Sequence, residues 1–120
     1  MERMNRCASV PGVTVLHVYL AEAHPSDGWF ARDTPAIKTA TCLEDRRAAI
    51  DKFVARAKPV GDVVADAMDN GAARAFSAFP DRIVVLRADG TFAYTQRSGP
   101  MFYNALEALA FLEANAPKAD

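Results

Sequence analysis

Residues 13–29 read VTVLHVYLAEAHPSDGW, and the expected fold follows from how this segment begins and ends. Its first part, Val13–Leu20, is almost continuously apolar and rich in β-branched residues, which is typical of a strand covered on both faces of a parallel sheet. The apolar run stops at Glu22 and His24, and a Pro-Ser-Asp-Gly turn leads to Trp29. We therefore predict a central strand whose carboxyl end carries polar side chains.

Helices are predicted on both sides of this strand. Met1–Cys7 has a helical pattern that ends at a Val-Pro-Gly break, and a loop over residues 21–40 follows the strand. Thr41 and Glu44 have the spacing of a capping box for a helix over Leu43–Ala57, which Lys58-Pro59 ends. The residues expected on its core face are Leu43, Ile50, Phe53, Val54 and Ala57.

The second half of the chain predicts a strand, a hairpin and a closing helix. Val60–Met68 has the pattern of a second buried strand, and Asp69-Asn70-Gly71 introduces a short helix that ends near Phe76. Asp89-Gly90 between the apolar runs Arg82–Leu86 and Phe92–Gln96 predicts a hairpin. Asn104 and Glu107 form a second capping box, and the core-facing residues expected after it are Leu106, Leu109, Ala110 and Leu112. This order predicts an α/β fold with a mixed sheet.

Composition narrows the class of protein. At 120 residues and 51% hydrophobic, the chain fits one domain over residues 1–120. Fourteen Lys and Arg against fifteen Asp and Glu favour neither nucleic acid nor a membrane surface as partner. No apolar run is long enough for a membrane span or a signal peptide, so we expect a cytoplasmic protein. Cys7 and Cys42 match neither a disulfide framework nor a metal motif.

The carboxyl end of the first strand is the candidate site, because ligands bind beyond the carboxyl ends of parallel strands. If the strand stays extended, Glu22 and His24 point the same way, and the carboxylate can orient the imidazole in a proton relay. The alternative is a turn with two solvated side chains. A metal site with Asp27 as third ligand is disfavoured, since no helical histidine pair supports it. His17 is expected to be structural, and Trp29 to anchor the loop.

The stretch YLAEAHPSDGW is similar to a signature of the iodothyronine deiodinases, selenoenzymes that reductively remove iodine from thyroid hormones. Further similarity extends over almost the whole chain, in the order of the family. The matching segments are Leu43-Glu44-Asp45-Arg46, Met68-Asp69-Asn70, Phe79-Pro80-Asp81-Arg82 with its hairpin, and Ser98-Gly99-Pro100.

The resemblance implies a thioredoxin-like fold of the peroxiredoxin type, in which Phe79–Pro80 is expected to be a cis bond. It implies that Glu22 and His24 are catalytic, handling substrate and protons beside a selenocysteine or cysteine. It places three more residues of the signature at the substrate, namely Ser26, Asp27 and Trp29. Arg97, an approximate counterpart of a basic residue in the family's hairpin, could pair with a substrate carboxylate.

The family's nucleophile lies in a turn that opens the first helix, so here it is expected to precede Met1, together with the first central strand of the sheet. The resulting hypothesis is a deiodinase-like oxidoreductase for iodinated phenols, with an external thiol reductant and no bound cofactor. Two alternatives remain, a peroxiredoxin-like thiol peroxidase that uses hydroperoxides and a non-catalytic binding module. An exposed sheet edge could also pair two copies in a homodimer.

Overall fold

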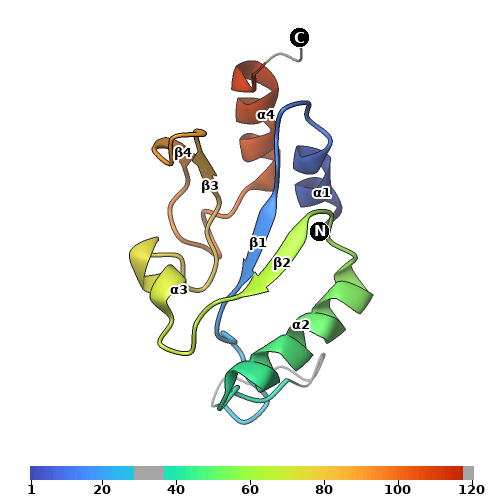
Figure 1. The fold of residues 1–120 in the computed structure, drawn as a ribbon, viewed down its shortest axis with the longest axis vertical. Coiled ribbons are helices and arrows are strands. Elements are labelled where there is room, and N and C mark those ends of the chain that lie inside the picture. The colour runs from blue at the N-terminus through green and yellow to red at the C-terminus, as the bar shows by residue number, and fades with distance from the viewer. Residues whose placement is uncertain (29–36, 118–120) are drawn as a thin grey trace.

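The structure is a computed structural model that describes residues 1–28 and 37–117. Helices and strands alternate before a hairpin and a closing helix (Figure 1), which confirms the predicted mixed α/β class. The elements are α1 (Glu2–Ala8), β1 (Leu16–Tyr19), α2 (Leu43–Ala57), β2 (Asp62–Ala65), α3 (Gly71–Ala75), β3 (Val84–Leu86), β4 (Phe92–Thr95) and α4 (Ala105–Asn115).

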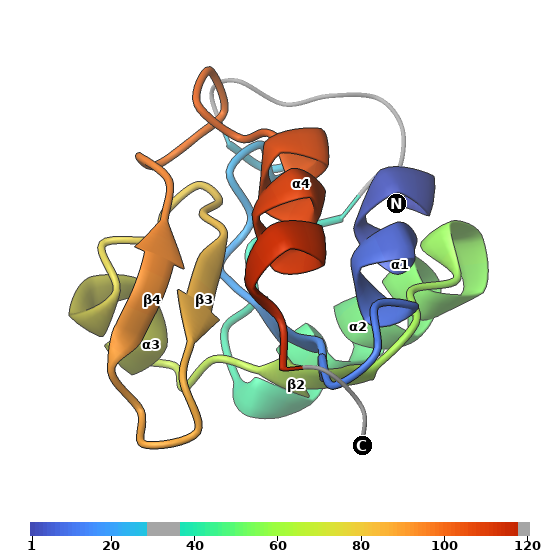
Figure 2. The ribbon, with the colours of Figure 1, turned by 90° about the horizontal axis from the view of Figure 1, so that it is seen from above.

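The strands form two separate two-stranded sheets within the described residues. β1 and β2 are parallel, with His17 opposite Val63, and β3 and β4 form the predicted antiparallel hairpin, with Val85 opposite Tyr94. Across the molecule the strands follow the order β4, β3, β1, β2 (Figures 1 and 2). β1 is shorter than the predicted strand Val13–Leu20. Of the two strands beside it, β2 is hydrogen-bonded to β1 and β3 is not.

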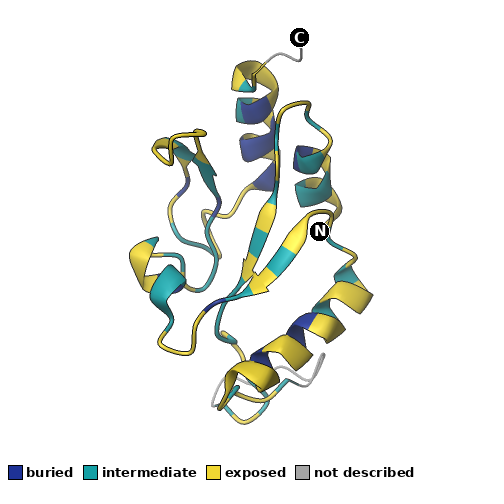
Figure 3. Ribbon diagram, viewed as in Figure 1, coloured by how far each residue is buried: buried dark blue, intermediate teal, exposed yellow. Residues whose placement is uncertain are grey.

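The core is small and lies mainly between α1 and α4, as the distribution of buried residues in Figure 3 shows. Cys7, which is 2% exposed, packs with Leu109 and Leu112, and Met4 reaches both this cluster and a second one. The second cluster consists of Ile83, Ala105 and Ala108. Burial raises the pKa of the Cys7 thiol, and this buried position agrees with a structural rather than a reactive cysteine.

Helix α2 has the predicted bounds, but its cap differs from the prediction and only part of the predicted core face is buried. The backbone N–H and the hydroxyl of Thr41 donate to the carboxylate of Asp45, at 3.0 and 2.9 Å, so the cap contact involves Asp45 rather than Glu44. The helix ends at Lys58 with φ of 49°, as the Lys-Pro signal predicted. Its buried residues are Arg46, Ala49 and Ile50, whereas Leu43 and Val54 are exposed. The predicted core face is therefore confirmed at Ile50 and wrong at Leu43 and Val54, because the buried face includes Arg46 and Ala49 instead.

Two further predictions need correction. Val60–Met68 is not a long buried strand, since β2 has four residues whose exposure alternates with the pleat. In α4 the Asn104 side chain accepts from the Glu107 N–H at 3.0 Å, as predicted. Leu109 and Leu112 are buried against Cys7 of α1, and Ala105 and Ala108 are buried against Ile83, whereas Leu106 and Ala110 are exposed.

The segment between α3 and α4 contains two cis bonds, the expected Phe79–Pro80 and a second at Gly99–Pro100. The two cis bonds lie close together in space, because the Gly99 N–H donates to the Asp81 carbonyl at 2.7 Å. A Cβ at position 99 would lie 1.6 Å from Asp81 Oδ1, so a larger residue there would require the Asp81 side chain to move. Similarly, a Cβ at Gly61 would lie 2.3 Å from the Val15 carbonyl oxygen, where the chain enters β2.

Candidate active site

The carboxyl end of β1 positions Glu22 through Tyr19, the last residue of the strand. The Tyr19 hydroxyl donates to Oε1 of Glu22, and the Tyr19 ring lies 5.7 Å from the Phe53 ring of α2, centroid to centroid. Burial, together with this hydrogen bond, raises the pKa of Tyr19 well above its ordinary value. The phenol therefore stays protonated and remains a donor to the carboxylate.

Glu22 also lines a small cavity at this end of the strand. The cavity has a volume of about 50 Å³ and lies between the end of β1, the segment 37–40 and the first half of α2. Its lining residues are Tyr19, Leu20, Ala21, Glu22, Ile37, Lys38, Thr39, Ala40, Arg46 and Ala49. This volume is enough for about one water molecule. A half-buried carboxylate that is held by a phenol and faces a water-sized space can accept or pass on a proton.

His24 lies in a bend at residues 23–24 and is exposed. Since β1 ends at Tyr19, the strand alternation that would direct Glu22 and His24 to the same side does not extend to them. The structure brings the Tyr19 hydroxyl onto the Glu22 carboxylate through the hydrogen bond given above. A relay that includes both Glu22 and His24 stays a prediction.

Ser26 and Asp27 hold the two ends of the long loop together. The Ser26 N–H donates to the Ile37 carbonyl at 2.7 Å. The Asp27 carboxylate accepts from the N–H and the hydroxyl of Thr39, at 2.7 and 3.0 Å, and these bonds lower the pKa of Asp27. Both residues therefore have a structural contact, and their predicted contact with a substrate stays a prediction. The third residue of this group, Trp29, lies outside the described residues.

Arg97 is exposed at the end of the hairpin. Its guanidinium lies 5.3 Å from the centroid of the Phe102 ring, a cation–π geometry. Arg97 does not line the Glu22 cavity. The pairing of Arg97 with a substrate carboxylate stays a prediction.

A buried polar network, which the sequence did not reveal, supports one wall of the Glu22 cavity. Arg46 is 4% exposed, and its Nη1 donates to the carbonyl oxygens of Asp66 and Ala67, both at 2.9 Å. Its Nη2 donates to Oδ1 of Asn70 at 3.3 Å. The arginine thereby ties α2 to the turn after β2. Its spacing of four from Ile50 on the helix is the signal that could have placed it on the buried face.

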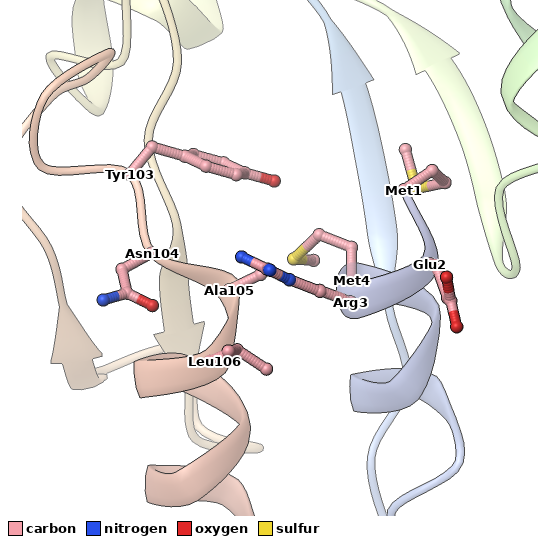
Figure 4. A pocket seen from close by; sticks show the side chains of 8 residues that line it. All are labelled: Met1, Glu2, Arg3, Met4, Tyr103, Asn104, Ala105 and Leu106. Atoms are coloured by element: carbon pink, nitrogen blue, oxygen red, sulfur yellow. The ribbon is translucent and has the colours of Figure 1, made fainter.

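A second, larger cavity opens between the starts of α1 and α4 and has a volume of about 560 Å³ (Figure 4). It is lined by Met1, Glu2, Arg3, Met4, Tyr103, Asn104, Ala105 and Leu106. None of the predicted site residues lines it. We place the candidate active site at Glu22 because that cavity contains the predicted carboxylate with a bound phenol, whereas the larger cavity holds no predicted catalytic group.

Asp81 is a further group that sequence reasoning missed. Its Oδ1 is buried and has no hydrogen-bond partner within the described part of the chain. Burial raises the pKa of this carboxyl, and the Gly99 N–H offsets the effect only in part. Tyr103, at the rim of the larger cavity, is close enough that Asp81 contributes to raising its pKa, after burial as the main cause.

Residues 1–28 and 37–117 contain no cluster of three or more His, Cys, Asp or Glu side chains that could hold a metal ion. No helix within these same ranges is both long enough and apolar enough to cross a membrane.

Comparison with known proteins gives one family. The family model described as iodothyronine deiodinase matches residues 8–116. A thyroxine 5-deiodinase of Sparus aurata is 40% identical over 99 residues, which are 82% of this chain and 36% of that protein. Type II iodothyronine deiodinases of Petromyzon marinus and Gallus gallus are each 39% identical, over 82% and 86% of this chain and 35% and 39% of theirs. The chain thus spans about a third of the length of these curated relatives.

Proposed function

Because this chain belongs to the iodothyronine deiodinase family, we propose that it is part of a deiodinase-like oxidoreductase that removes iodine reductively from iodinated phenols. The observation that carries the proposal, beyond the family match, is the Glu22 carboxylate held by Tyr19 at the carboxyl end of β1. This is the place where a parallel α/β sheet exposes its reacting groups.

The proposed reaction balances with a selenol or thiol as nucleophile. The selenolate or thiolate attacks iodine, the carbon–iodine bond breaks, and iodine stays on selenium or sulfur. The electron pair of the broken bond remains on the ring carbon, which takes up a proton. A thiol reductant then releases iodide from the selenenyl or sulfenyl iodide, and its two thiols become a disulfide.

The residues of this chain supply the proton in the proposed step. Glu22, held by the Tyr19 hydroxyl, faces a space the size of a water molecule, through which a proton can reach it. His24, exposed two residues further on, gives up the proton to the ring carbon. Ser26, Asp27 and Trp29 would shape the adjoining loop around the substrate, and Arg97 would meet its carboxylate.

The nucleophile is proposed to lie before Met1, where the family places it. Cys7 is buried and its pKa is raised, so its thiolate is disfavoured. Cys42 is exposed at the start of α2, without a contact that marks it as a nucleophile in the described residues. The reductant is an external thiol, no bound cofactor is needed, and the protein works in the cytoplasm in this proposal.

The test is an assay of the gene product, expressed both from Met1 and with the codons that precede Met1. Iodide release from an iodinated phenol in the presence of dithiothreitol is expected for the extended form. The His24→Ala variant should lose about 100-fold or more of that rate. The Cys42→Ser variant, which removes the exposed thiol, should retain it.

Other outcomes would replace the proposal. Consumption of hydroperoxide without iodide release would identify a thiol peroxidase instead. If neither activity appears in the extended form, or if His24→Ala leaves iodide release unchanged, the assignment of a proton relay to this strand end is wrong.

A further inference from the structure

Two oppositely charged side chains lie on the wall of the small cavity at the end of β1. Arg46, which is 4% exposed, lines this cavity from α2, and Glu22 lines it from the strand end. Within the described residues the two side chains form no ion pair, although they share the cavity. A small group placed between them can therefore contact both.

One nitrogen of Arg46 has no hydrogen-bond partner in the described part of the chain. Nη1 and Nη2 donate to the turn after β2, at the carbonyl oxygens of Asp66 and Ala67 and at Oδ1 of Asn70. Nε, by contrast, is buried and unpaired among these residues. A buried donor of a charged group is costly to leave without an acceptor, so the Nε–H marks a position where an acceptor binds.

The Glu22 carboxylate provides the opposite half of this site. Its Oε1 accepts from the Tyr19 hydroxyl, which leaves Oε2 for a donor in the cavity. A guanidinium only donates and a carboxylate only accepts, so a group that bridges them must accept from Nε and donate to the carboxylate. A water molecule meets both requirements.

The size and the walls of the cavity fit such a bridge. The cavity has a volume of about 50 Å³, and a water molecule occupies about 30 Å³ in the liquid. Thr39 in its outer wall is held by two hydrogen bonds to the Asp27 carboxylate, at 2.7 and 3.0 Å. The buried Ala49 closes it on the α2 side. The space is therefore suited to water and too small for the ring of an iodinated phenol.

We infer that the Glu22 cavity binds one ordered water molecule, which accepts a hydrogen bond from Nε of Arg46 and donates one to the carboxylate of Glu22. Arg46 is thereby a positioning residue for Glu22, because it acts through the water and its guanidinium cannot give up a proton. It fixes the orientation of the water, since a molecule that accepts from Nε directs its O–H groups away from the arginine.

The consequence for turnover rests on the proposed function. When Glu22 passes a proton towards His24, the water gives a proton to Glu22 and takes one from solvent, so the charge of the site is restored. Lys38 and Thr39, which are both exposed, form the wall between the cavity and solvent. Loss of the water should therefore lower kcat and leave KM nearly unchanged.

Nuclear magnetic resonance tests the water site in the 120-residue chain without any substrate. A rotating-frame Overhauser cross peak to water, opposite in sign to solvent exchange, is expected at Hε of Arg46 and at the γ protons of Glu22. The neighbouring Arg47 provides the comparison, since it is exposed and its Hε should show only exchange with solvent.

Ala49→Val and Ala48→Val form a matched pair of variants on α2. Position 49 lines the cavity and position 48 is exposed, whereas the loss of helix propensity is the same. Ala49→Val should occupy the space of the water and remove both cross peaks, and Ala48→Val should keep them. Far-UV circular dichroism checks that both variants are folded. If Ala49→Val does not fold, Ala21→Val fills the same cavity from the strand end.

The same variants test the role of the bridge in the form extended by the codons before Met1. Ala49→Val should lower kcat for iodide release at least about tenfold, with a change in KM of less than about twofold. Ala48→Val should release iodide at the wild-type rate.

Two results would overturn the inference. If the wild-type chain lacks the water cross peak at Arg46 or at Glu22, no water bridges the two side chains. If a folded Ala49→Val protein loses both cross peaks but keeps its kcat, the bridge does not position Glu22 for turnover. A wild type that releases no iodide would contradict the proposed function, while the cross peaks, which need no substrate, would still decide for or against the water site.

Discussion

Tyr19 and Glu22 form the contact on which the proposed proton relay depends. We expect Tyr19→Phe to keep the ring packed on Phe53 but to lose the hydrogen bond to Glu22, at about 1 kcal/mol of unfolding free energy. Burial raises the pKa of Tyr19 above its ordinary 10.0, so the folded state holds the phenol proton more tightly than the unfolded state. Wild-type stability should therefore fall as pH rises above about 10.

The measurement is urea denaturation near neutral pH and above pH 10, with Tyr19→Phe showing the shallower loss at alkaline pH. Since Tyr94 and Tyr103 also have raised pKa values, some loss should persist in the variant. Equal slopes for the two proteins would show that Tyr19 is not the buried donor described above.

Asp81 provides a prediction of the same sign at lower pH, because the ionised form of this carboxyl is also disfavoured in the folded state. Burial raises its pKa above the ordinary 3.8, so wild-type stability should fall as pH rises through the interval above that value. Asp81→Asn removes this charge and should be more stable than wild type near neutral pH. Chemical denaturation at acidic and neutral pH checks this, and the two proteins should converge at low pH. A variant that is less stable at neutral pH would mean that the carboxylate has a partner.

At the scale of the elements, Arg46 links α2 to the turn that follows β2. Arg46→Lys should lose the two-carbonyl contact of the guanidinium and cost about 2–3 kcal/mol of unfolding free energy. The neighbouring exposed Arg47 offers a matched control, and Arg47→Lys should change stability by less than about 0.5 kcal/mol. If both variants unfold at the same urea concentration, the network around Arg46 does not support the fold.

The start of α3 depends on a different buried residue. Asp66, 3% exposed, accepts from the N–H groups of Ala72 and Ala73 at 2.8 and 2.9 Å. Burial alone would raise the pKa of Asp66, but these hydrogen bonds outweigh burial and lower it. Asp66→Ala should therefore be less stable by about 1–3 kcal/mol near neutral pH.

This contribution should disappear in acid, because a lowered pKa stabilises the fold only above the folded-state value. Wild type and Asp66→Ala should approach each other as the pH falls below about 3.8, the ordinary value. Thermal unfolding followed over this range provides the measurement. A difference that stays constant with pH would show that packing, rather than the charge, accounts for the loss.

Features that depend on neighbouring residues were predicted well from the sequence. Features that depend on tertiary packing were predicted less well. The ends of α2, the hairpin at Gly90 and the Asn104 cap depend on neighbouring residues alone, and they were found as predicted. The buried faces of α2 and α4 depend on which elements pack on them. The burial of Arg46, and the exposure of Leu106, could therefore not be seen in the periodicity.

In the candidate site, too, the position of a residue along the chain was predicted from the sequence, whereas its tertiary contacts were not. The position of Glu22 at the end of β1 follows from the abrupt end of an apolar run, and the family match covers this segment. The Tyr19 donor and the loop contacts of Asp27 depend on how residues 21–28 fold back on the segment 37–40, which no local pattern encodes. Strand alternation was a poor guide to Glu22 and His24 because the strand ends before either residue.

At the scale of the whole molecule, the two small sheets are not hydrogen-bonded to each other within the described residues. The cluster shared by α1 and α4 packs against Val15, just before β1, and against Val85 of β3. The proposed active site lies at the carboxyl end of β1.

The measurement that tests the central claim most directly is the rate of iodide release by the gene product, expressed with the codons before Met1. Glu22→Gln is compared with Glu44→Gln, which makes the same change at an exposed position of α2. We predict a loss of about 100-fold or more for Glu22→Gln and the wild-type rate for Glu44→Gln. A Glu22→Gln variant that releases iodide at the wild-type rate would contradict the account, since the Tyr19–Glu22 contact would then be structural alone.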